Sequence, residues 1–242
     1  AGGFGKRLTP ITNDIPKPLL KVGAKPILEN IIEEFIDAGF HNFYISTHYK
    51  ADMVQEYFGD GSDLYASMLT SQPAKTLMIS CCDSRVDPAI LTDCEPGDLF
   101  IVRNVANLVP PCEHDGLHHG TSSALEYAVN HLKVENIIIM GHASCGGIKA
   151  LWEDDGTGQS QFIHSWMSIA GPAKEWVKDK LSTATSDEKI KACEQRAIVE
   201  SLANLMTFNW IHDKVEQGAI SLHGWYFDIP AGELLGYNPK TG

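Results

Sequence analysis

Residues 76–85 read Thr-Leu-Met-Ile-Ser-Cys-Cys-Asp-Ser-Arg, a run of apolar residues that passes directly into thiols, a carboxylate and a guanidinium. The apolar part predicts a short buried strand, and the polar residues follow its carboxyl end. Because alternate residues of an extended segment share one face, Cys81, Asp83 and Arg85 are able to converge, while Cys82 points away. This stretch therefore predicts a strand that presents one thiolate beside one charged pair.

A second predicted strand ends in the same kind of chemistry. Asn-Ile-Ile-Ile-Met at 136–140 is apolar enough for a buried strand, and Gly-His-Ala-Ser-Cys-Gly-Gly follows at 141–147. His142 and Cys145 are three positions apart, a spacing that brings two side chains to one side of a helical turn. Open α/β sheets bind ligands at the carboxyl ends of their strands, so we expect the two motifs to meet at one edge of the sheet.

The rest of the chain alternates between predicted strands and helices, which indicates an α/β fold. We expect a mainly parallel central sheet flanked by helices, preceded by a Rossmann-like fragment at the amino terminus. Turn-forming residues at 59–62 separate two predicted domains, 1–62 and 63–242. The further predicted strands are 43–46, 99–103 and a strand pair within 220–229, and the predicted helices are 27–38, 121–132 and 194–208.

The composition argues against several classes of function. A chain of 242 residues with 43% hydrophobic and 21% charged residues is typical of a globular protein. Its formal charge of −12 disfavours a nucleic-acid partner, because a phosphate backbone attracts a basic face. No apolar run approaches the ~20 residues of a membrane helix, so we expect no membrane association. The six cysteines lack a disulfide-like pattern and no signal peptide is visible, which predicts reduced thiols in the cytoplasm.

The two motifs together supply a ligand set for zinc. Cys81, His142 and Cys145 provide two thiolates and an imidazole, the donors that zinc prefers. Asp83 either completes the set or stays off the metal and leaves the fourth position to water. Arg85 favours the second arrangement, because a guanidinium two residues from a carboxylate can hold it in a bidentate pair. We therefore predict a catalytic zinc; the alternative is a closed structural site in a non-catalytic, zinc-stabilised module.

Residues 63–242 resemble a β-class carbonic anhydrase. The resemblance is carried by Cys-Cys-Asp-Ser-Arg at 81–85, Arg-Asn-Val-Ala-Asn at 103–107, His-Ala-Ser-Cys-Gly-Gly at 142–147 and Leu-His-Gly-Trp at 222–225. It implies a zinc bound by Cys, His and Cys, a catalytic Asp–Arg dyad, and self-association as a dimer or tetramer. The implied reaction is the reversible hydration of carbon dioxide to bicarbonate by zinc-bound hydroxide, in which the dyad aspartate orients the hydroxide.

The same resemblance assigns an apolar substrate pocket, formed partly by a neighbouring subunit. Its apolar walls are Phe100, Val105 and Tyr127, and Gln72 stands where many family members place a glutamine that hydrogen-bonds the substrate. The backbone N–H of Gly146 is a second candidate donor to the substrate. Some bacterial members of the family hold an inhibitory bicarbonate with a Trp, an Arg and a Tyr. Met78 and Phe227 stand at the first and third of these positions, which leaves only Arg103. We therefore expect no such inhibition, and we expect Asp83 to stay off the metal.

The amino-terminal segment has a different resemblance. Ala-Gly-Gly-Phe-Gly-Lys-Arg-Leu at 1–8 and Pro-Lys-Pro-Leu-Leu at 16–20 are similar to the start of a sugar-phosphate nucleotidyltransferase. In that family a glycine loop wraps nucleotide phosphates through its backbone N–H groups. The acidic metal ligand and the sugar pocket of the family do not follow, so we predict a non-catalytic fragment, and nucleotide transfer is the less favoured alternative. The vestigial phosphate-binding candidates are Gly2, Gly3, Gly5, Arg7 and Lys17.

Overall fold

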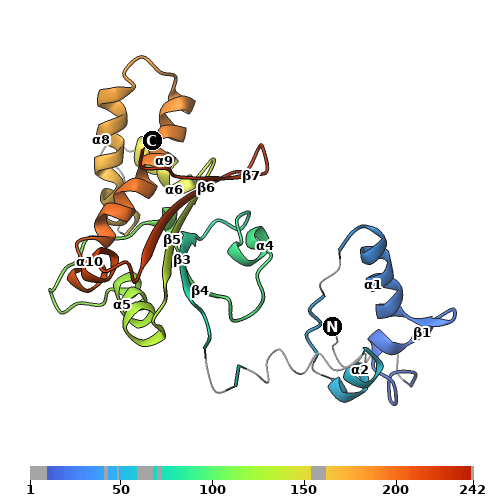
Figure 1. Ribbon diagram of the computed structural model, residues 1–242. Helices are drawn as coiled ribbons and strands as arrows, with labels where there is room; N and C mark the ends of the chain where they lie inside the picture. The colour runs from blue at the N-terminus through green and yellow to red at the C-terminus, as the bar shows by residue number, and fades with distance from the viewer. Residues whose placement is uncertain are drawn as a thin grey trace. The chain divides into compact units, whose positions relative to one another are not determined.

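The computed structural model describes residues 10–40, 43–47, 49–58, 68–69, 72–153 and 162–240. The chain divides into two compact units, residues 1–69 and 70–242 (Figure 1). In the described part of the chain, no helix is both long enough and apolar enough to cross a bilayer.

The second unit is built on a five-stranded sheet with the order β4-β3-β5-β6-β7. The first four strands of this order run parallel, and β7 pairs antiparallel with β6 at one edge. This arrangement confirms the predicted mainly parallel α/β sheet. The strands are β3 (Thr76–Cys81), β4 (Leu99–Asn104), β5 (Asn136–His142), β6 (Ser221–Asp228) and β7 (Glu233–Gly236).

The described helices of this unit all lie in the connections between consecutive parallel strands, as such a sheet requires. They are α4 (Pro88–Thr92), α5 (Gly120–Glu126), α6 (Gly146–Glu153), α7 (Ile163–Met167), α8 (Gly171–Lys180), α9 (Ser186–Leu205) and α10 (Asn209–Glu216). The predicted helix over 121–132 is α5 together with a following π-helical segment, η4 (Tyr127–Leu132). A 3-10 turn, η3 (Val105–Asn107), follows β4, and another, η5 (Ser168–Ala170), follows α7.

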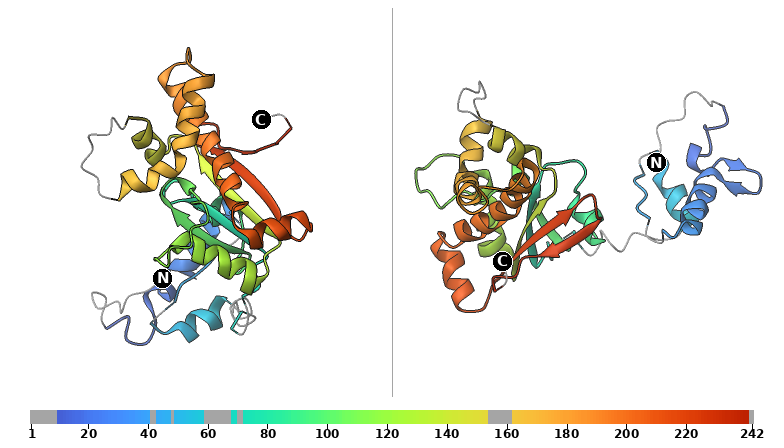
Figure 2. Two further views of the ribbon diagram at one scale, coloured as in Figure 1. Left: turned by 90° about the vertical axis from the view of Figure 1, so that its left-hand side faces the viewer. Right: turned by 90° about the horizontal axis from the view of Figure 1, so that it is seen from above.

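Both faces of the sheet are covered, which explains why β3 and β5 read as almost unbroken apolar runs. Leu77 and Ile139 face a core that also contains residues of α5, α9 and α10, and these helices lie along the same face (Figure 2). Met78 and Met140 point to the opposite face, where Leu91 of α4 packs against them. Strands buried in this way hold their carboxyl ends in fixed positions, and that edge carries the two motifs.

Helix α9 packs unusually close to the sheet. A Cβ atom added to Gly141 would lie 2.8 Å from Cδ1 of Ile198, and one added to Gly224 would lie 2.9 Å from Cγ2 of the same residue. These two glycines of β5 and β6 therefore form a seat for Ile198. Glu194 precedes Ile198 by one helical turn, so the seat also fixes where Glu194 lies.

Two sequence predictions in this unit need correction. The strand pair within 220–229 is wrong: β6 pairs with β5 over seven consecutive residues and leaves no room for a turn there. Its antiparallel partner β7 follows a turn closed by a hydrogen bond from Gly232 N to Asp228 O. The helix predicted over 194–208 begins earlier, at Ser186, because Thr185 and Glu188 form a capping box that starts it.

The described residues of the first unit form two short strands and three helical segments. These are η2 (Lys17–Leu19), β1 (Lys21–Val22), β2 (Lys25–Pro26), α1 (Ile27–Asp37) and α2 (Ala51–Phe58), and β1 and β2 pair antiparallel. The helix predicted over 27–38 is confirmed as α1. The strand predicted over 43–46 is wrong, since the described residues 43–47 have no regular structure and no described strand pairs with them.

The described part of the first unit therefore lacks the parallel sheet that a Rossmann-like fragment requires. Helix α1 carries an apolar stripe, yet none of its residues is buried, and Ile31 and Phe35 are 42% and 49% exposed. An amphipathic helix normally buries such a stripe against a sheet or another helix. Within the described residues, this unit therefore has the predicted amphipathic helix but no sheet that covers its apolar stripe.

Candidate metal centre

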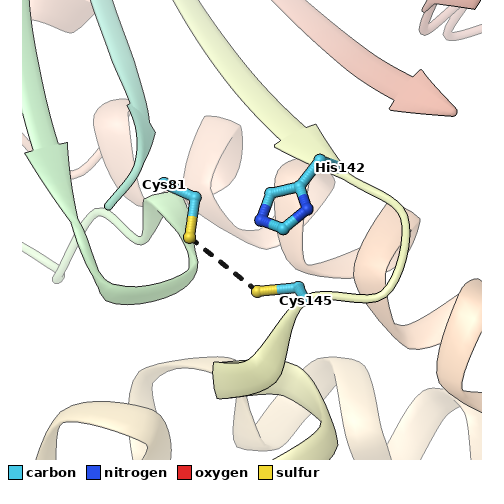
Figure 3. A group of neighbouring side chains, drawn as sticks. All are labelled: Cys81, His142 and Cys145. Atoms are coloured by element: carbon cyan, nitrogen blue, oxygen red, sulfur yellow. Dashed lines mark hydrogen bonds between the residues drawn. The ribbon is translucent and has the colours of Figure 1, made fainter. Parts of the chain in front are cut away.

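Three potential ligands converge at the carboxyl edge of the parallel sheet. Cys81 ends β3 and His142 ends β5, and these strands are neighbours. Cys145 lies directly before α6, and its Sγ is 4.0 Å from Sγ of Cys81 (Figure 3). The ligand atoms of all three side chains lie within 4.8 Å of one another, and the residues are 5%, 1% and 2% exposed. The predicted convergence of the two motifs is confirmed.

The geometry of this triad fits a zinc ion. A tetrahedral zinc with bonds of about 2.3 Å to sulfur separates two thiolates by about 3.8 Å, close to the separation of Cys81 and Cys145. His142 Nδ1 is 2.9 Å from the carbonyl oxygen of Ala143, which leaves Nε2 to face the sulfurs. That nitrogen is buried and has no hydrogen-bond partner. A buried polar atom without a partner is rare, and a metal ion would satisfy it.

The surroundings of the two sulfurs favour a thiolate at Cys81. The hydrogen bond with the Cys145 thiol lowers the pKa of Cys81 to about 4, and the same hydrogen bond raises the pKa of Cys145, so the first negative charge resides on Cys81. Backbone N–H groups of Asp83 and Ala106 also stabilise the charge on Cys81, and that of Gly147 stabilises charge on Cys145. Such donors prepare both sulfurs to bind a cation.

Asp83 and Arg85 form a bidentate pair beside the triad. Arg85 Nε donates to Asp83 Oδ1 at 2.9 Å, and Nη2 donates to Oδ2 at 2.7 Å. These hydrogen bonds hold the pKa of Asp83 well below its usual range, so the carboxylate is ionised at neutral pH. Its Oδ2 is 4.0 Å from His142 Nε2. The carboxylate therefore lies next to the metal-binding atoms while both of its oxygens are bound by Arg85.

Arg103 holds the loop that follows β3 through hydrogen bonds to its backbone. Its Nε donates to the carbonyl oxygen of Cys81 at 2.9 Å, and its Nη2 donates to that of Asp83 at 2.6 Å. Nη1 is 3.3 Å from Oδ2 of Asp87. Met78, at the position of the missing Trp, is fully buried in the core. Arg103 is thus engaged in holding the backbone of the ligand loop.

Two of the predicted substrate-pocket residues lie beside the ligands. Val105 begins η3, and its Cγ1 would be 2.8 Å from a Cβ atom on Gly147, so it touches the turn that carries Cys145. Gly146 is the first residue of α6, and a Cβ atom added to it would meet nothing within 4 Å. Val105 therefore forms an apolar wall beside the turn that carries Cys145, and the space next to Gly146 is open.

The remaining predicted pocket residues lie away from the triad of their own chain. Phe100 and Tyr127 contact each other, with ring centroids 5.8 Å apart. Phe100 precedes Asn104, the register partner of Cys81, by four residues of β4, which is about 13 Å along the strand. Gln72 precedes the amino end of β3 and is exposed. A single chain does not bring these three residues to the metal ligands.

Other sequence candidates fall outside this centre. Gly2, Gly3, Gly5 and Arg7 lie outside the described residues, and Lys17 begins η2 and is exposed. The structure also brings a second donor group together on the loop before α5, where ligand atoms of three side chains lie within 4.8 Å of one another: Glu113, Asp115 and His119. His119 Nε2 is 2.6 Å from Asp115 Oδ1, and Leu117 N donates to the same oxygen, so hydrogen bonding of an exposed loop accounts for this group.

The sequence analysis missed one residue of the centre. Glu194 of α9 is 3% exposed, and its Oε1 accepts a hydrogen bond of 2.9 Å from the backbone N–H of Cys145. Its Oε2 accepts one of 2.8 Å from the hydroxyl of Tyr226, and burial raises the pKa of the carboxyl group. A signal for this residue is present in the sequence, because Glu194 lies four positions before the apolar Ile198 and therefore on the same, core-facing side of the helix.

Comparison with known proteins agrees with this geometry. The family model described as carbonic anhydrase matches residues 76–234, and one described as nucleotidyl transferase matches residues 1–93. Beta carbonic anhydrase 5, chloroplastic, of Arabidopsis thaliana is 44% identical over 172 residues, which cover 70% of this chain and 56% of that protein. Beta carbonic anhydrase 3 of the same plant is 34% identical over 202 residues, 82% of this chain and 74% of that protein.

Solved structures show the same fold. The β-carbonic anhydrase CcaA superposes with a TM-score of 0.71 at 30% identity, over 88% of each chain. One of two tetrameric β-carbonic anhydrases from the ascomycete Sordaria macrospora superposes with a TM-score of 0.68 at 23% identity, over 86% of this chain and 98% of that one.

The chain spans somewhat more than half the length of two Arabidopsis relatives, carbonic anhydrases 5 and 6. Within that span, Cys81, His142 and Cys145 form the buried triad that is typical of a β-carbonic anhydrase zinc site. Sequence match, fold and ligand set lead to one assignment. The chain belongs to the carbonic anhydrase family, in its β class.

Proposed function

We propose that this chain catalyses the zinc-dependent, reversible hydration of carbon dioxide to bicarbonate. The observation that carries the proposal is a buried Cys–His–Cys triad whose neighbouring carboxylate, Asp83, is held by Arg85. A closed structural zinc site needs four protein ligands, whereas a catalytic site leaves one position to solvent. When bound, zinc lowers the pKa of a coordinated water to about 7 and so supplies the nucleophile at neutral pH.

The side chains around the triad have separate tasks in this reaction. Asp83 accepts a hydrogen bond from the reacting water and orients its lone pair toward carbon dioxide. Arg85 keeps that carboxylate ionised and aimed, since both of its oxygens accept from the guanidinium. Val105 supplies an apolar wall for an apolar substrate, and the backbone N–H of Gly146 is a donor for an oxygen of bicarbonate.

We further propose that the substrate pocket is completed by a second copy of the chain. Phe100, Tyr127 and Gln72 lie far from the triad of their own chain, and Tyr127 is 46% exposed although it is aromatic. Phe100 is partly buried on the edge strand β4, and the exposed Tyr127 ring of η4 packs against it, an arrangement suited to a subunit interface. The assembly is a dimer or a tetramer; the Sordaria enzymes are described as tetrameric.

The proposal is tested by metal analysis together with stopped-flow hydration of carbon dioxide. We expect one zinc per chain and measurable hydration in the unaltered protein, and loss of both in Cys145→Ser. Cys94→Ser is the matched control, because Cys94 is a half-buried thiol outside the triad and should leave both quantities unchanged. Stoichiometric zinc without hydration in the unaltered protein would favour the non-catalytic zinc module.

The two resemblances suggest that the two parts of the chain differ in function. We propose that residues 63–242 form the catalytic domain and that residues 1–62 form a non-catalytic fragment. A nucleotidyl transferase match over 1–93 supports the origin of the fragment. Cytoplasmic location stays a prediction from the free thiols; relatives of this chain carry the words chloroplastic and mitochondrial in their names. Imaging of a tagged full-length protein would locate it.

A further inference from the structure

We propose that Glu194 is a positioning residue of the metal centre, which holds the turn carrying Cys145 in register with the Asp83–Arg85 pair. The inference rests on the proposed function, since it concerns the same site, but its principal readouts are metal affinity and ligand geometry. Its basis is a buried carboxylate, contributed by α9, that contacts the backbone of a ligand without touching the metal-binding atoms.

Glu194 connects the ligand turn to the centre of the sheet. Its Oε1 accepts from the backbone N–H of Cys145 at 2.9 Å, and its Oε2 accepts from the hydroxyl of Tyr226 at 2.8 Å. Tyr226 belongs to β6, is 4% exposed, and is itself fixed by the strand register with Gly141. The carboxylate thus connects the paired strands β5 and β6, through Tyr226, to the backbone of Cys145.

The turn needs such support because its backbone is strained. Ser144, between the two ligands His142 and Cys145, has a φ of 58°, in the left-handed region that side chains other than glycine rarely adopt. Residues in this region persist only where the surroundings hold them. Arg85 Nη2 donates to the carbonyl oxygen of Ser144 at 3.1 Å, so the same turn also positions the guanidinium of the dyad.

The burial of Glu194 argues for a specific task. A buried carboxylate is costly unless it is fully hydrogen-bonded, and an apolar side chain of similar size would fill the same space without that penalty. The glycine seat formed by Gly141 and Gly224 brings α9 close enough for Glu194 to reach the turn. The close approach and the buried acceptor together indicate that the position of Cys145 is set by this contact. Groups that orient metal ligands in this way tune affinity and geometry.

The test compares three full-length variants with the unaltered protein. Glu194→Leu removes both acceptors, and Glu194→Gln keeps a carbonyl oxygen for the Cys145 N–H. Glu200→Gln is the control, because Glu200 lies on the same helix but pairs with Arg196 at 2.7 Å, away from the triad. The readouts are the zinc dissociation constant by chelator competition and the visible spectrum of the cobalt-substituted protein, which reports ligand geometry.

We expect Glu194→Leu to weaken zinc binding by about 10- to 100-fold, the usual effect of losing a group that orients a ligand, and to shift the cobalt bands. Glu194→Gln should restore both readouts toward the unaltered protein, and Glu200→Gln should leave both unchanged. A folded Glu194→Leu protein with unaltered zinc affinity and unaltered cobalt bands would overturn the proposal. If that variant does not fold, Tyr226→Phe removes one support, and unchanged cobalt bands there would equally overturn it.

Failure of this inference is distinguishable from failure of the proposed function. If the unaltered protein binds zinc but hydrates no carbon dioxide, the proposed activity is lost, and the effect of Glu194 on metal affinity can still be measured. If hydration is normal and Glu194→Leu binds zinc normally, the activity stands and the positioning role is refuted.

Discussion

Replacing Arg85 with Ala should slow hydration of carbon dioxide while zinc stays bound. The side chain of Arg85 makes two charge-assisted hydrogen bonds to Asp83, of 2.9 Å and 2.7 Å, and contacts no ligand side chain of the triad. Without them, Asp83 is free to rotate and to compete with water for the metal. The dyad would then no longer hold an acceptor beside the reacting water.

The size of the effect follows from the exposure of the pair. Groups that orient the side chains around a metal typically contribute about 10- to 100-fold to activity. The side chain of Arg85 is 50% exposed, so solvent screens its pair with Asp83, and we expect a decrease in kcat/KM toward the lower end of this range.

Stopped-flow kinetics with a pH indicator, combined with zinc analysis, measures both quantities. Arg85→Lys is the matched comparison, because it keeps the charge but not the planar fork, and we expect it to fall between Ala and the unaltered protein. Zinc content should equal that of the unaltered protein in both variants. Undiminished turnover in Arg85→Ala would refute the dyad role, and loss of zinc would show that Arg85 supports the ligands themselves.

Four further changes have defined outcomes. Gly224→Ala should destabilise the second unit by about 1–3 kcal/mol in urea unfolding, because the new Cβ overpacks against Ile198, and an unchanged midpoint would contradict the close approach of α9. Deleting residues 1–60 should leave zinc stoichiometry intact, since the triad lies wholly in the other compact unit; loss of metal would show that the two units fold together. Thr185→Ala should lower stability by about 1 kcal/mol through loss of the helix cap. Hydrogen bonds from the Thr185 backbone and side chain lower the pKa of Glu188, so the charged carboxylate stabilises the fold above its unfolded pKa, and this stabilisation is lost as pH falls through the folded pKa. Glu188→Gln should therefore weaken the decrease in the free energy of unfolding below about pH 5. An unchanged decrease in the variant would argue against the capping box.

The sequence predicts those parts of the metal centre whose residues directly follow the end of a strand. Two apolar runs ended in Cys81 and His142, and a parallel sheet brings such ends to one edge, so their meeting follows from local sequence. Pairing of Asp83 with Arg85 likewise needs only two residues of separation. These features depend on short-range geometry, which the sequence carries directly.

Other features depend on contacts between distant segments, and the sequence did not reveal them. Glu194 lies near the middle of α9, and its role arises from its distance to the backbone of Cys145, 49 residues away. Residues 43–46 have strand-like composition, but strand formation requires a partner, and no described segment pairs with them. Phe100 lies far from the triad of its own chain, so its predicted place in the substrate pocket depends on a second subunit, which the sequence of one chain does not describe.

The most direct test of the account is a crystal structure of the zinc-loaded protein with anomalous data collected at the zinc edge. We expect one strong peak among Cys81 Sγ, Cys145 Sγ and His142 Nε2, with the Asp83 carboxylate still paired to Arg85. A peak elsewhere, or a zinc whose fourth ligand is Asp83 at alkaline pH, would contradict a catalytic centre that keeps one position for water.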